Sequence, residues 1–147
     1  MPSTVRLHRV LTAPPERVYR AFLEADAMVR WLPPNGFTAS VESYDAREGG
    51  RFRMAFHHFA TGETHRFGGE FLELVPHRLI RYTDQFDDPG LPGTIEVTVT
   101  LAAVSCGTEL SIEQAGIPDA IPPEQCYLGW QQSLENLARL VNAPGPG

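Results

Sequence analysis

The sequence predicts an α+β domain in which an antiparallel sheet curves around one long C-terminal helix. Between Phe37 and Gln114, apolar and polar residues alternate in short runs, which is typical of strands with one buried face. Towards the C-terminus the spacing changes to steps of three and four, which predicts a helix with a buried stripe at Tyr127, Trp130, Leu134, Leu137 and Val141. Because such a stripe must pack on something, we expect this helix to cover the sheet, with a cavity between them.

The start of the chain predicts one strand followed by two short helices. Residues alternate over Val5–Leu11, and Pro14 and Pro15 then end the strand. Prolines suit the first turn of a helix, because the amides of that turn have no partner inside the helix. We expect Asp26 to cap a second short helix that runs through Trp31 and ends before the prolines at 33–34.

Six further strands are expected, each bounded by glycine- or proline-containing turns. In the strand after the Glu48–Gly50 turn, alternation puts one apolar set on the inner face: Phe52, Met54, Phe56 and His58. The proline- and glycine-rich loop at 87–93 should form a rim beside whatever the sheet encloses. The expected strands cover residues 37–41, 51–59, 67–75, 79–86, 95–101 and 110–112.

Composition excludes several classes of function. A chain of 147 residues is long enough for one domain with a proper core, and we expect a single domain over 1–147 with a disordered tail at 143–147. The net charge of -6 argues against nucleic acid as a partner, because non-specific affinity depends on clustered cations. All 12 basic residues are arginines, so no lysine can form a Schiff base. We expect a cytoplasmic protein without membrane insertion, because neither a signal peptide nor a membrane-spanning run is present.

The polar residues do not form a known catalytic or metal-binding pattern. His57 and His58 are adjacent on a strand and must point to opposite faces, so they cannot share one metal ion. Asp84, Asp87 and Asp88 lack the spacing of a calcium loop, and we interpret them as a solvated acidic loop. The two cysteines are too few for a metal quartet and are expected to be ordinary thiols. We therefore predict no catalytic residue, no metal ligand and no cofactor.

Several motifs occur in an order that resembles a known family. The segments that carry the resemblance are APPERVYRAFL at 13–23, WLPPNGF at 31–37, DAREGG at 45–50, GEFLELVPHRLIRYT at 69–83, GTEL at 107–110 and GW at 129–130. Together they resemble the C-terminal domain family of activator-of-heat-shock-chaperone-ATPase homologues, a branch of the START and birch-allergen-like (SRPBCC) superfamily. The resemblance covers nearly the whole chain and implies the helix-grip fold.

The same resemblance implies a hydrophobic cavity between the sheet and the C-terminal helix. In other members of the superfamily this cavity binds lipids, hormones or polyketides and occasionally supports cyclisation. The cochaperones after which the family is named use a further N-terminal domain that these residues do not encode, so chaperone activation does not follow from the resemblance. For this chain we expect a ligand-binding set of Trp31, Phe52, Met54, Phe56, His58, Phe71, Tyr82, Trp130 and Leu134.

Three functions remain open from the sequence, and the first is preferred. The chain binds a small hydrophobic or amphipathic molecule in the cavity without turning it over. Alternatively it is an enzyme for an aromatic or polyketide-like substrate, in which Tyr82, His58 or an inward glutamate moves protons. The third hypothesis is a chaperone-accessory or other protein-interaction module, which needs an exposed apolar patch. The sequence leaves open whether the chain forms a homodimer.

Overall fold

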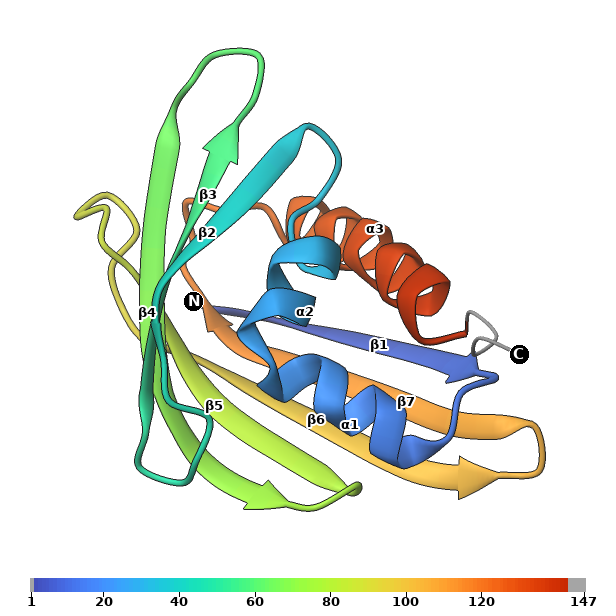
Figure 1. Ribbon diagram of the computed structural model, residues 1–147. Helices are drawn as coiled ribbons and strands as arrows, with labels where there is room; N and C mark the ends of the chain where they lie inside the picture. The colour runs from blue at the N-terminus through green and yellow to red at the C-terminus, as the bar shows by residue number, and fades with distance from the viewer. Residues whose placement is uncertain (1, 143–147) are drawn as a thin grey trace.

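The computed structural model describes residues 2–142, so the tail predicted at 143–147 lies outside the described residues. Its elements confirm the predicted α+β class and the order of strands and helices (Figure 1). In chain order they are β1 Ser3–Leu11, α1 Pro15–Leu23, α2 Ala25–Trp31, β2 Phe37–Tyr44, β3 Arg51–His58, β4 Thr64–Val75, β5 Leu79–Phe86, β6 Ile95–Val104, β7 Gly107–Ile117 and α3 Pro123–Val141.

The seven strands form one antiparallel sheet in the order β1-β7-β6-β5-β4-β3-β2. Strands β2 to β7 follow one another as neighbours, and β1 pairs with β7 at the far edge. The segment with α1 and α2 therefore carries the chain from one edge of the sheet to the other. Figure 1 shows the sheet curving around the three helices, which all lie on its concave side.

The two short helices begin and end where the prolines and polar residues dictate, with one correction. Pro14 caps α1, Pro15 occupies its first turn, and Glu16 places a negative charge near the positive end of the helix dipole. Asp26 does not cap α2 as predicted, because the helix already begins at Ala25 and its N-cap is Glu24. Asp26 instead lies inside the first turn, where its charge also favours the dipole.

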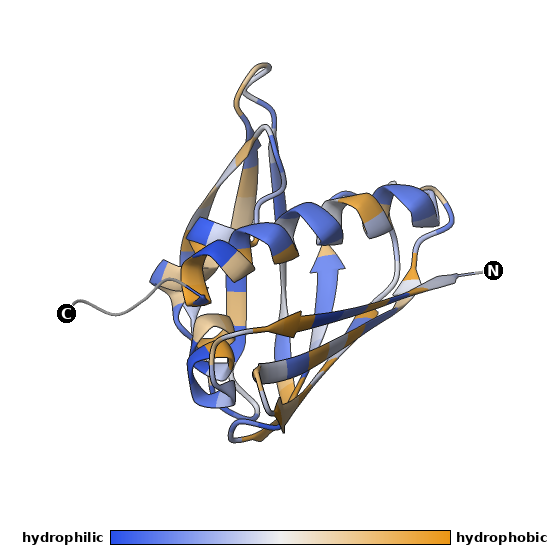
Figure 2. Cartoon of the chain, turned by 90° about the vertical axis from the view of Figure 1, so that its right-hand side faces the viewer, coloured by the Kyte–Doolittle hydropathy of each residue, from blue (hydrophilic) through white to orange (hydrophobic). Residues whose placement is uncertain are grey.

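The long helix α3 packs through the stripe predicted from its spacing, but Tyr127 is not part of it. The buried residues of α3 are Trp130, Ser133, Leu134, Leu137 and Val141. Tyr127 is 38% exposed because it lies close to the N-terminal end of the helix, beside the exposed Leu128. Hydrophobic and hydrophilic residues alternate along α3 where it lies in front of the sheet in Figure 2. Within the described part of the chain, no helix combines the length and apolarity needed to span a lipid bilayer.

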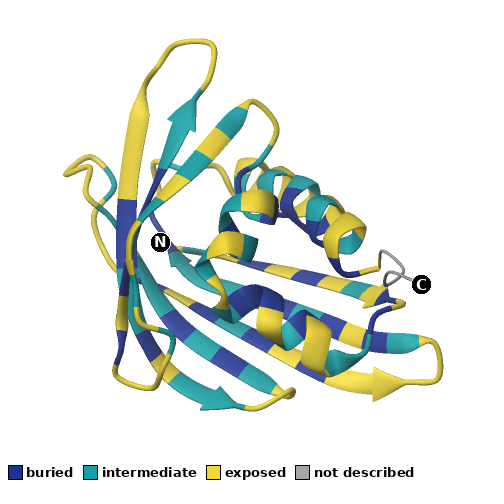
Figure 3. Cartoon of the chain, in the orientation of Figure 1, coloured by how far each residue is buried: buried dark blue, intermediate teal, exposed yellow. Residues whose placement is uncertain are grey.

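Burial along the strands alternates with the period of two that the sequence predicts. In β6, Ile95, Val97, Val99 and Leu101 are buried while the residues between them are partly or fully exposed. A similar alternation is visible along parts of β1, β5 and β7 in Figure 3. The inner side chains of the sheet and the buried stripe of α3 belong to one hydrophobic core. The side chains that face the helices are therefore fixed by the register of the strands.

A pair of glycines lies where β4 passes very close to its neighbours. Gly68 and Gly69 lie in the middle of the sheet, and a β-carbon added to Gly69 would overlap the backbone carbonyl of Thr83 on β5. A register shift follows between Phe71 and Glu73, which increases the local bend of the strand. No side chain larger than hydrogen fits at Gly69 without moving the backbone of β5.

The Gly69→Ala variant should therefore be destabilised by about 2 to 3 kcal/mol, as expected for overpacking against backbone. Chemical denaturation followed by circular dichroism measures this loss. The matched control is Gly62→Ala in the β3–β4 turn, where an added β-carbon meets open space and only the positive φ of 78° opposes it. If Gly69→Ala and the native protein had the same free energy of unfolding, β4 and β5 could move apart locally at no measurable cost, and the close approach at Gly69 would not limit the side chain there.

Candidate functional site: a cavity between the sheet and the C-terminal helix

A cavity of about 170 Å³ lies between the inner face of the sheet and helices α2 and α3. For comparison, an apolar cavity of roughly 150 Å³ accommodates benzene in an engineered protein. Its wall is apolar apart from a few side chains, and it consists of Met28, Leu32, Pro34, Tyr44, Phe52, Met54, Phe56, Phe67, Phe71, Tyr82, Asp84, Phe86, Gln114, Cys126, Gly129, Trp130 and Ser133. The space has the size and polarity of a site for one aromatic ring.

The cavity exists because α3 lies closer to one edge of the sheet than to its middle strands. Its backbone lies close to β1 at one edge and to α1 and α2, whereas the middle strands face it across the inner side chains. Ser133 fixes α3 to the end of α2 by donating a hydrogen bond to the carbonyl of Leu32, at 2.5 Å. The parts of the wall contributed by α2 and α3 are therefore held against each other.

Two more hydrogen bonds hold aromatic side chains of the wall in place. The Tyr44 hydroxyl on β2 donates to the carbonyl of Phe22 in α1, at 2.6 Å. The Trp130 indole N–H on α3 donates to Oε1 of Gln114 on β7, at 2.9 Å. Both bonds connect a helix to a strand, so they fix the shape of the cavity and satisfy polar atoms that would otherwise be buried without partners.

Asp84 is an ionisable side chain in this apolar wall. It lies on β5 two residues after Tyr82, so both side chains point to the inner face. Its Oδ1 is buried without a hydrogen-bond partner, and it is the one such side-chain atom among the described residues. The prediction that Asp84 belongs to a solvated acidic loop is therefore wrong, because β5 continues past it to Phe86.

Burial dominates the electrostatics of this group. Loss of solvation raises the pKa of Asp84 to about 7, opposed by a hydrogen bond from the backbone N–H of Gln85. Burial, and next the nearby charge of Asp84, raise the pKa of Tyr82 well above its usual value. Burial likewise raises the pKa of Tyr44 and of the Cys126 thiol. Of these cavity groups, Asp84 is the one that changes charge near neutral pH.

The structure brings together six of the nine residues expected to bind a ligand. Phe52, Met54 and Phe56 reach the cavity from β3, Phe71 from β4 and Tyr82 from β5, and Trp130 faces them from α3. These six residues therefore form a shared surface, as the alternation of the strands and the helical spacing of α3 predict.

The other three predicted residues lie outside the cavity wall. Trp31, the last residue of α2, is fully buried in the core. Its indole N–H donates to the carbonyl of Ala21. Leu134 points into the core from α3, at 1% exposure. His58 lies at the end of β3, where its ring packs edge-on against Phe37 and its Nδ1 lies 3.0 Å from Oγ1 of Thr61. All three are occupied with holding the fold.

Other wall residues were missed, but some had a signal in the sequence. Asp84 and Phe86 follow Tyr82 at steps of two on the same strand, so the inward orientation predicted for Tyr82 applies to them as well. Gly129 precedes Ser133 by one helical turn on the buried side of α3. By contrast, Met28, Leu32 and Pro34 reach the cavity through the packing of α2, which no local pattern indicates.

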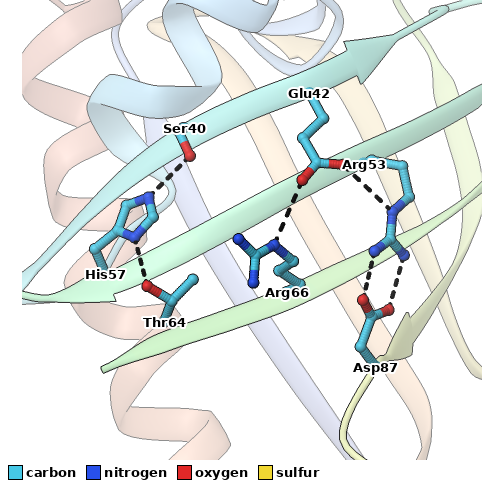
Figure 4. Close-up of polar contacts among 7 residues, drawn as sticks. All are labelled: Ser40, Glu42, Arg53, His57, Thr64, Arg66 and Asp87. Atoms are coloured by element: carbon cyan, nitrogen blue, oxygen red, sulfur yellow. Dashed lines mark hydrogen bonds and ion pairs between the residues drawn. The ribbon is translucent and has the colours of Figure 1, made fainter. Parts of the chain in front are cut away.

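The outer face of the sheet carries a separate polar network (Figure 4). His57 lies between two hydroxyls, with Nε2 2.8 Å from Ser40 and Nδ1 3.0 Å from Thr64. A serine beside a histidine resembles a nucleophile and its base, but the third member here is a hydroxyl instead of a carboxylate. The group also lies on a strand face that points away from the cavity, because Phe56 and His57 have opposite orientations. We interpret it as cross-strand hydrogen bonding.

The same face holds ion pairs that connect three strands and the loop after β5. Arg53 pairs with Asp87, and Glu42 lies 3.4 Å from Arg66. The bond from Arg53 lowers the pKa of Asp87. Within residues 2–142, no three His, Cys, Asp or Glu side chains come close enough to hold a metal ion. Of the acidic residues after β5, Asp87 thus serves an ion pair, and Asp88 accepts a hydrogen bond from the backbone N–H of Gly90.

Exposed apolar side chains do not mark a second site. Among the described residues, the exposed large apolar side chains are Val10 on β1, Phe59 in the turn after β3, Leu72 on β4, Val104 on β6, and Tyr127, Leu128 and Leu140 on α3. Apart from the adjacent Tyr127 and Leu128 they are spread along the sequence, and scattered exposed apolar residues are normal for a protein surface. The hypothesis of a protein-interaction module thus gains no support from them.

Comparison with known proteins agrees with this architecture. The family model described as "Activator of Hsp90 ATPase homolog 1-like protein" matches residues 12–142. The crystal structure of protein CV1439 from Chromobacterium violaceum is 64% identical, with a TM-score of 0.96 over 98% of this chain and 100% of that one. Protein MLL2253 from Mesorhizobium loti is 26% identical, with a TM-score of 0.74 over 98% and 100% of the two chains. A search of curated proteins finds no match.

A more distant structure shows the same fold. The solution structure of an AHSA1-like protein from Aeromonas hydrophila is 22% identical, with a TM-score of 0.77 over 95% of this chain and 92% of that one. At this identity the likeness supports the architecture alone.

Proposed function

The chain belongs to the family of Activator of Hsp90 ATPase homolog 1-like proteins, within the SRPBCC superfamily, and from this premise we propose that it binds a small hydrophobic molecule in the cavity. The observation that carries the proposal is the cavity itself, whose wall is made almost entirely of apolar and aromatic side chains. Burial of apolar ligand surface supplies roughly 25 cal/mol per Å². A molecule with one aromatic ring therefore has both the space and a driving force to enter.

Binding without turnover is favoured over catalysis because few polar groups of the wall are free to act. The hydroxyl of Tyr44, the indole N–H of Trp130 and the hydroxyl of Ser133 all donate to other protein atoms. An enzyme of the predicted kind needs several convergent groups that can exchange protons with the substrate. Tyr82 also lines the cavity, but burial raises its pKa well above the usual value, so Asp84 and Tyr82 support orientation of a ligand better than an acid–base pair that works near neutral pH.

Filling the cavity from α3 tests this function directly. Gly129 lines the cavity, and a β-carbon added there meets no atom within 4 Å. The Gly129→Leu variant should place its side chain in this open space and lower the affinity for 2-phenylethanol at least about tenfold, since the occupied volume excludes the ring. The variant should also be more stable than the native protein by about 1 kcal/mol, because glycine is a poor helix former.

The measurement is an NMR titration of isotope-labelled protein with 2-phenylethanol, a neutral compound with one ring. The matched control, Gln131→Leu, adds the same side chain on the exposed side of α3 and should bind like the native protein. Saturable shifts confined to residues of the cavity wall support the proposal. It fails if neither 2-phenylethanol nor other neutral single-ring compounds give saturable shifts, or if Gly129→Leu binds them as well as the control.

A further inference from the structure

The cavity contains an unsatisfied acceptor whose position is fixed by the sheet. Oδ1 of Asp84 has no hydrogen-bond partner, although buried polar atoms in folded proteins almost always have one. The backbone N–H of Gln85 satisfies part of the carboxyl group. Asp84 lies on β5 and lines the cavity together with Tyr82 and Phe86 of the same strand. The carboxyl group of Asp84 therefore belongs to the wall of the cavity and carries one oxygen without a partner.

The charge of the wall restricts what that molecule can be. Among the described residues that line the cavity, there is one carboxyl group and no arginine or histidine. A carboxylate buried without a counter-charge is costly, and a cationic partner removes much of that cost. An anionic ligand such as a carboxylate would meet repulsion and find no basic side chain. A neutral ligand would leave the charge unpaired.

The remaining wall suits a cation that is attached to an apolar group. Aromatic side chains from four strands and α3 surround the space, including Tyr44, Phe52, Phe71, Tyr82 and Trp130. The faces of aromatic rings attract ammonium groups by roughly 0.5 to 2 kcal/mol, and more strongly when water is excluded. A carboxylate within an aromatic wall is thus a suitable arrangement for recognising an organic ammonium ion.

We propose that the cavity is an amine-binding site: a protonated primary amine on an aromatic or similarly compact apolar group, with its ammonium paired to Asp84. This inference rests on the proposed function and adds the class of ligand. The apolar part of the ligand fills the aromatic cavity, and the ammonium pairs with the carboxyl group of Asp84. The volume of about 170 Å³ limits the apolar part to about one ring.

The pairing predicts how affinity depends on pH. The titratable groups that face the cavity beside Asp84 are Tyr82 on β5, Tyr44 on β2 and Cys126 on α3. Burial raises the pKa of each of these three groups, so they stay neutral up to pH 8. Asp84, with a pKa of about 7, becomes charged between pH 6 and 8. Amine affinity should therefore rise at least about tenfold from pH 5.5 to 8.

The experiment compares three probes that share a phenyl group and differ in the polar end: 2-phenylethylamine, 2-phenylethanol and phenylacetate. Affinities are measured by NMR titration at pH 5.5 and pH 8. At pH 8 the native protein should bind the amine about tenfold more tightly than the alcohol, and phenylacetate most weakly. In the Asp84→Asn variant the ratio of amine to alcohol affinity should fall to about one. Glu113→Gln, which removes an exposed carboxylate paired with Arg6, should keep the native ratio.

The outcomes separate this inference from the proposed function. If the native protein binds amine and alcohol equally at both pH values, or if Asp84→Asn keeps the native ratio, the amine site is refuted while the hydrophobic cavity stands. If none of the three probes binds, both proposals fail. The pH dependence of the native protein tests the inference without any substitution, so it does not depend on how the variant folds.

Discussion

The Asp84→Asn variant should be more stable than the native protein at pH 8, by up to about 4 kcal/mol, and the gain should vanish near pH 4. The folded state raises the pKa of Asp84 to about 7 from an ordinary value of 3.8. A tenfold change in the proton-binding constant corresponds to about 1.4 kcal/mol of free energy between the folded and unfolded states. Ionised Asp84 is therefore a source of instability in the apolar wall of the cavity.

The sign follows from proton binding. Between pH 4 and 7 the folded protein holds the Asp84 proton while the unfolded chain has released it. The folded state binds more protons, so the free energy of unfolding falls as pH rises through this window and levels off above it. Asparagine cannot ionise, so the free energy of unfolding of the variant does not fall with pH for this reason. Asp87, whose pKa is lowered by Arg53, is present in both proteins, and its contribution cancels in the difference.

Urea denaturation of both proteins at pH 4.5, 6 and 8 measures the effect. The difference in unfolding free energy should grow with pH in Asp84→Asn, and Glu113→Gln, which removes an exposed carboxylate, is the control. A difference that does not change with pH would mean that water in the cavity solvates Asp84 fully. Such a result would also remove the electrostatic reason for an amine ligand.

Replacement of Trp31 by alanine should destabilise the protein by about 3 to 5 kcal/mol. The side chain is fully buried, its ring contacts Phe22 edge-on with centroids 4.8 Å apart, and its N–H donates to Ala21 at 2.9 Å. Alanine would remove all these contacts and leave a large void beneath α2. Thermal and urea denaturation measure the loss.

Trp31→Phe serves as the matched control for the void. It keeps a ring against Phe22 but removes the hydrogen bond to Ala21, so about 1 to 3 kcal/mol should be lost. Because Trp31 lies outside the cavity wall, affinity for 2-phenylethanol should be the same in Trp31→Phe and the native protein. A large loss of affinity in a folded Trp31→Phe variant would instead support the expectation from sequence that Trp31 binds the ligand.

Local periodicity was sufficient for most of the architecture. The bounds expected for β5, residues 79–86, agree with the structure, and β4 begins three residues earlier than expected, at Thr64. The periods of strands and helices follow from backbone geometry alone. They can therefore be recognised in the sequence wherever one face of an element is buried and the other is exposed to solvent. The prediction that Asp26 caps α2 was wrong, because the position of a helix boundary depends on a few hydrogen bonds and can differ by one or two residues from the position that the sequence pattern indicates.

The cavity is a feature that local sequence patterns do not predict. Alternation correctly placed Phe52, Met54 and Phe56 on the inner face, yet it could not distinguish a side chain that lines a space from one that fills the core. Trp31 and Leu134 have the same apolar character as Trp130 and lie in the filled core. The difference depends on where α3 contacts its neighbours, which is a property of the packed molecule.

The sequence by itself determined the α+β class, the order of the elements and the apolar faces of β3, β6 and β7, because these depend on hydrophobic periods of two and about 3.6 residues. Only the tertiary structure decided that α3 leaves a space above the middle strands, and that Asp84 faces this space with one oxygen unpaired. The physical reason is that burial of a polar atom and the presence of a void depend on distances between elements far apart in the chain. No local pattern of residue types specifies those distances.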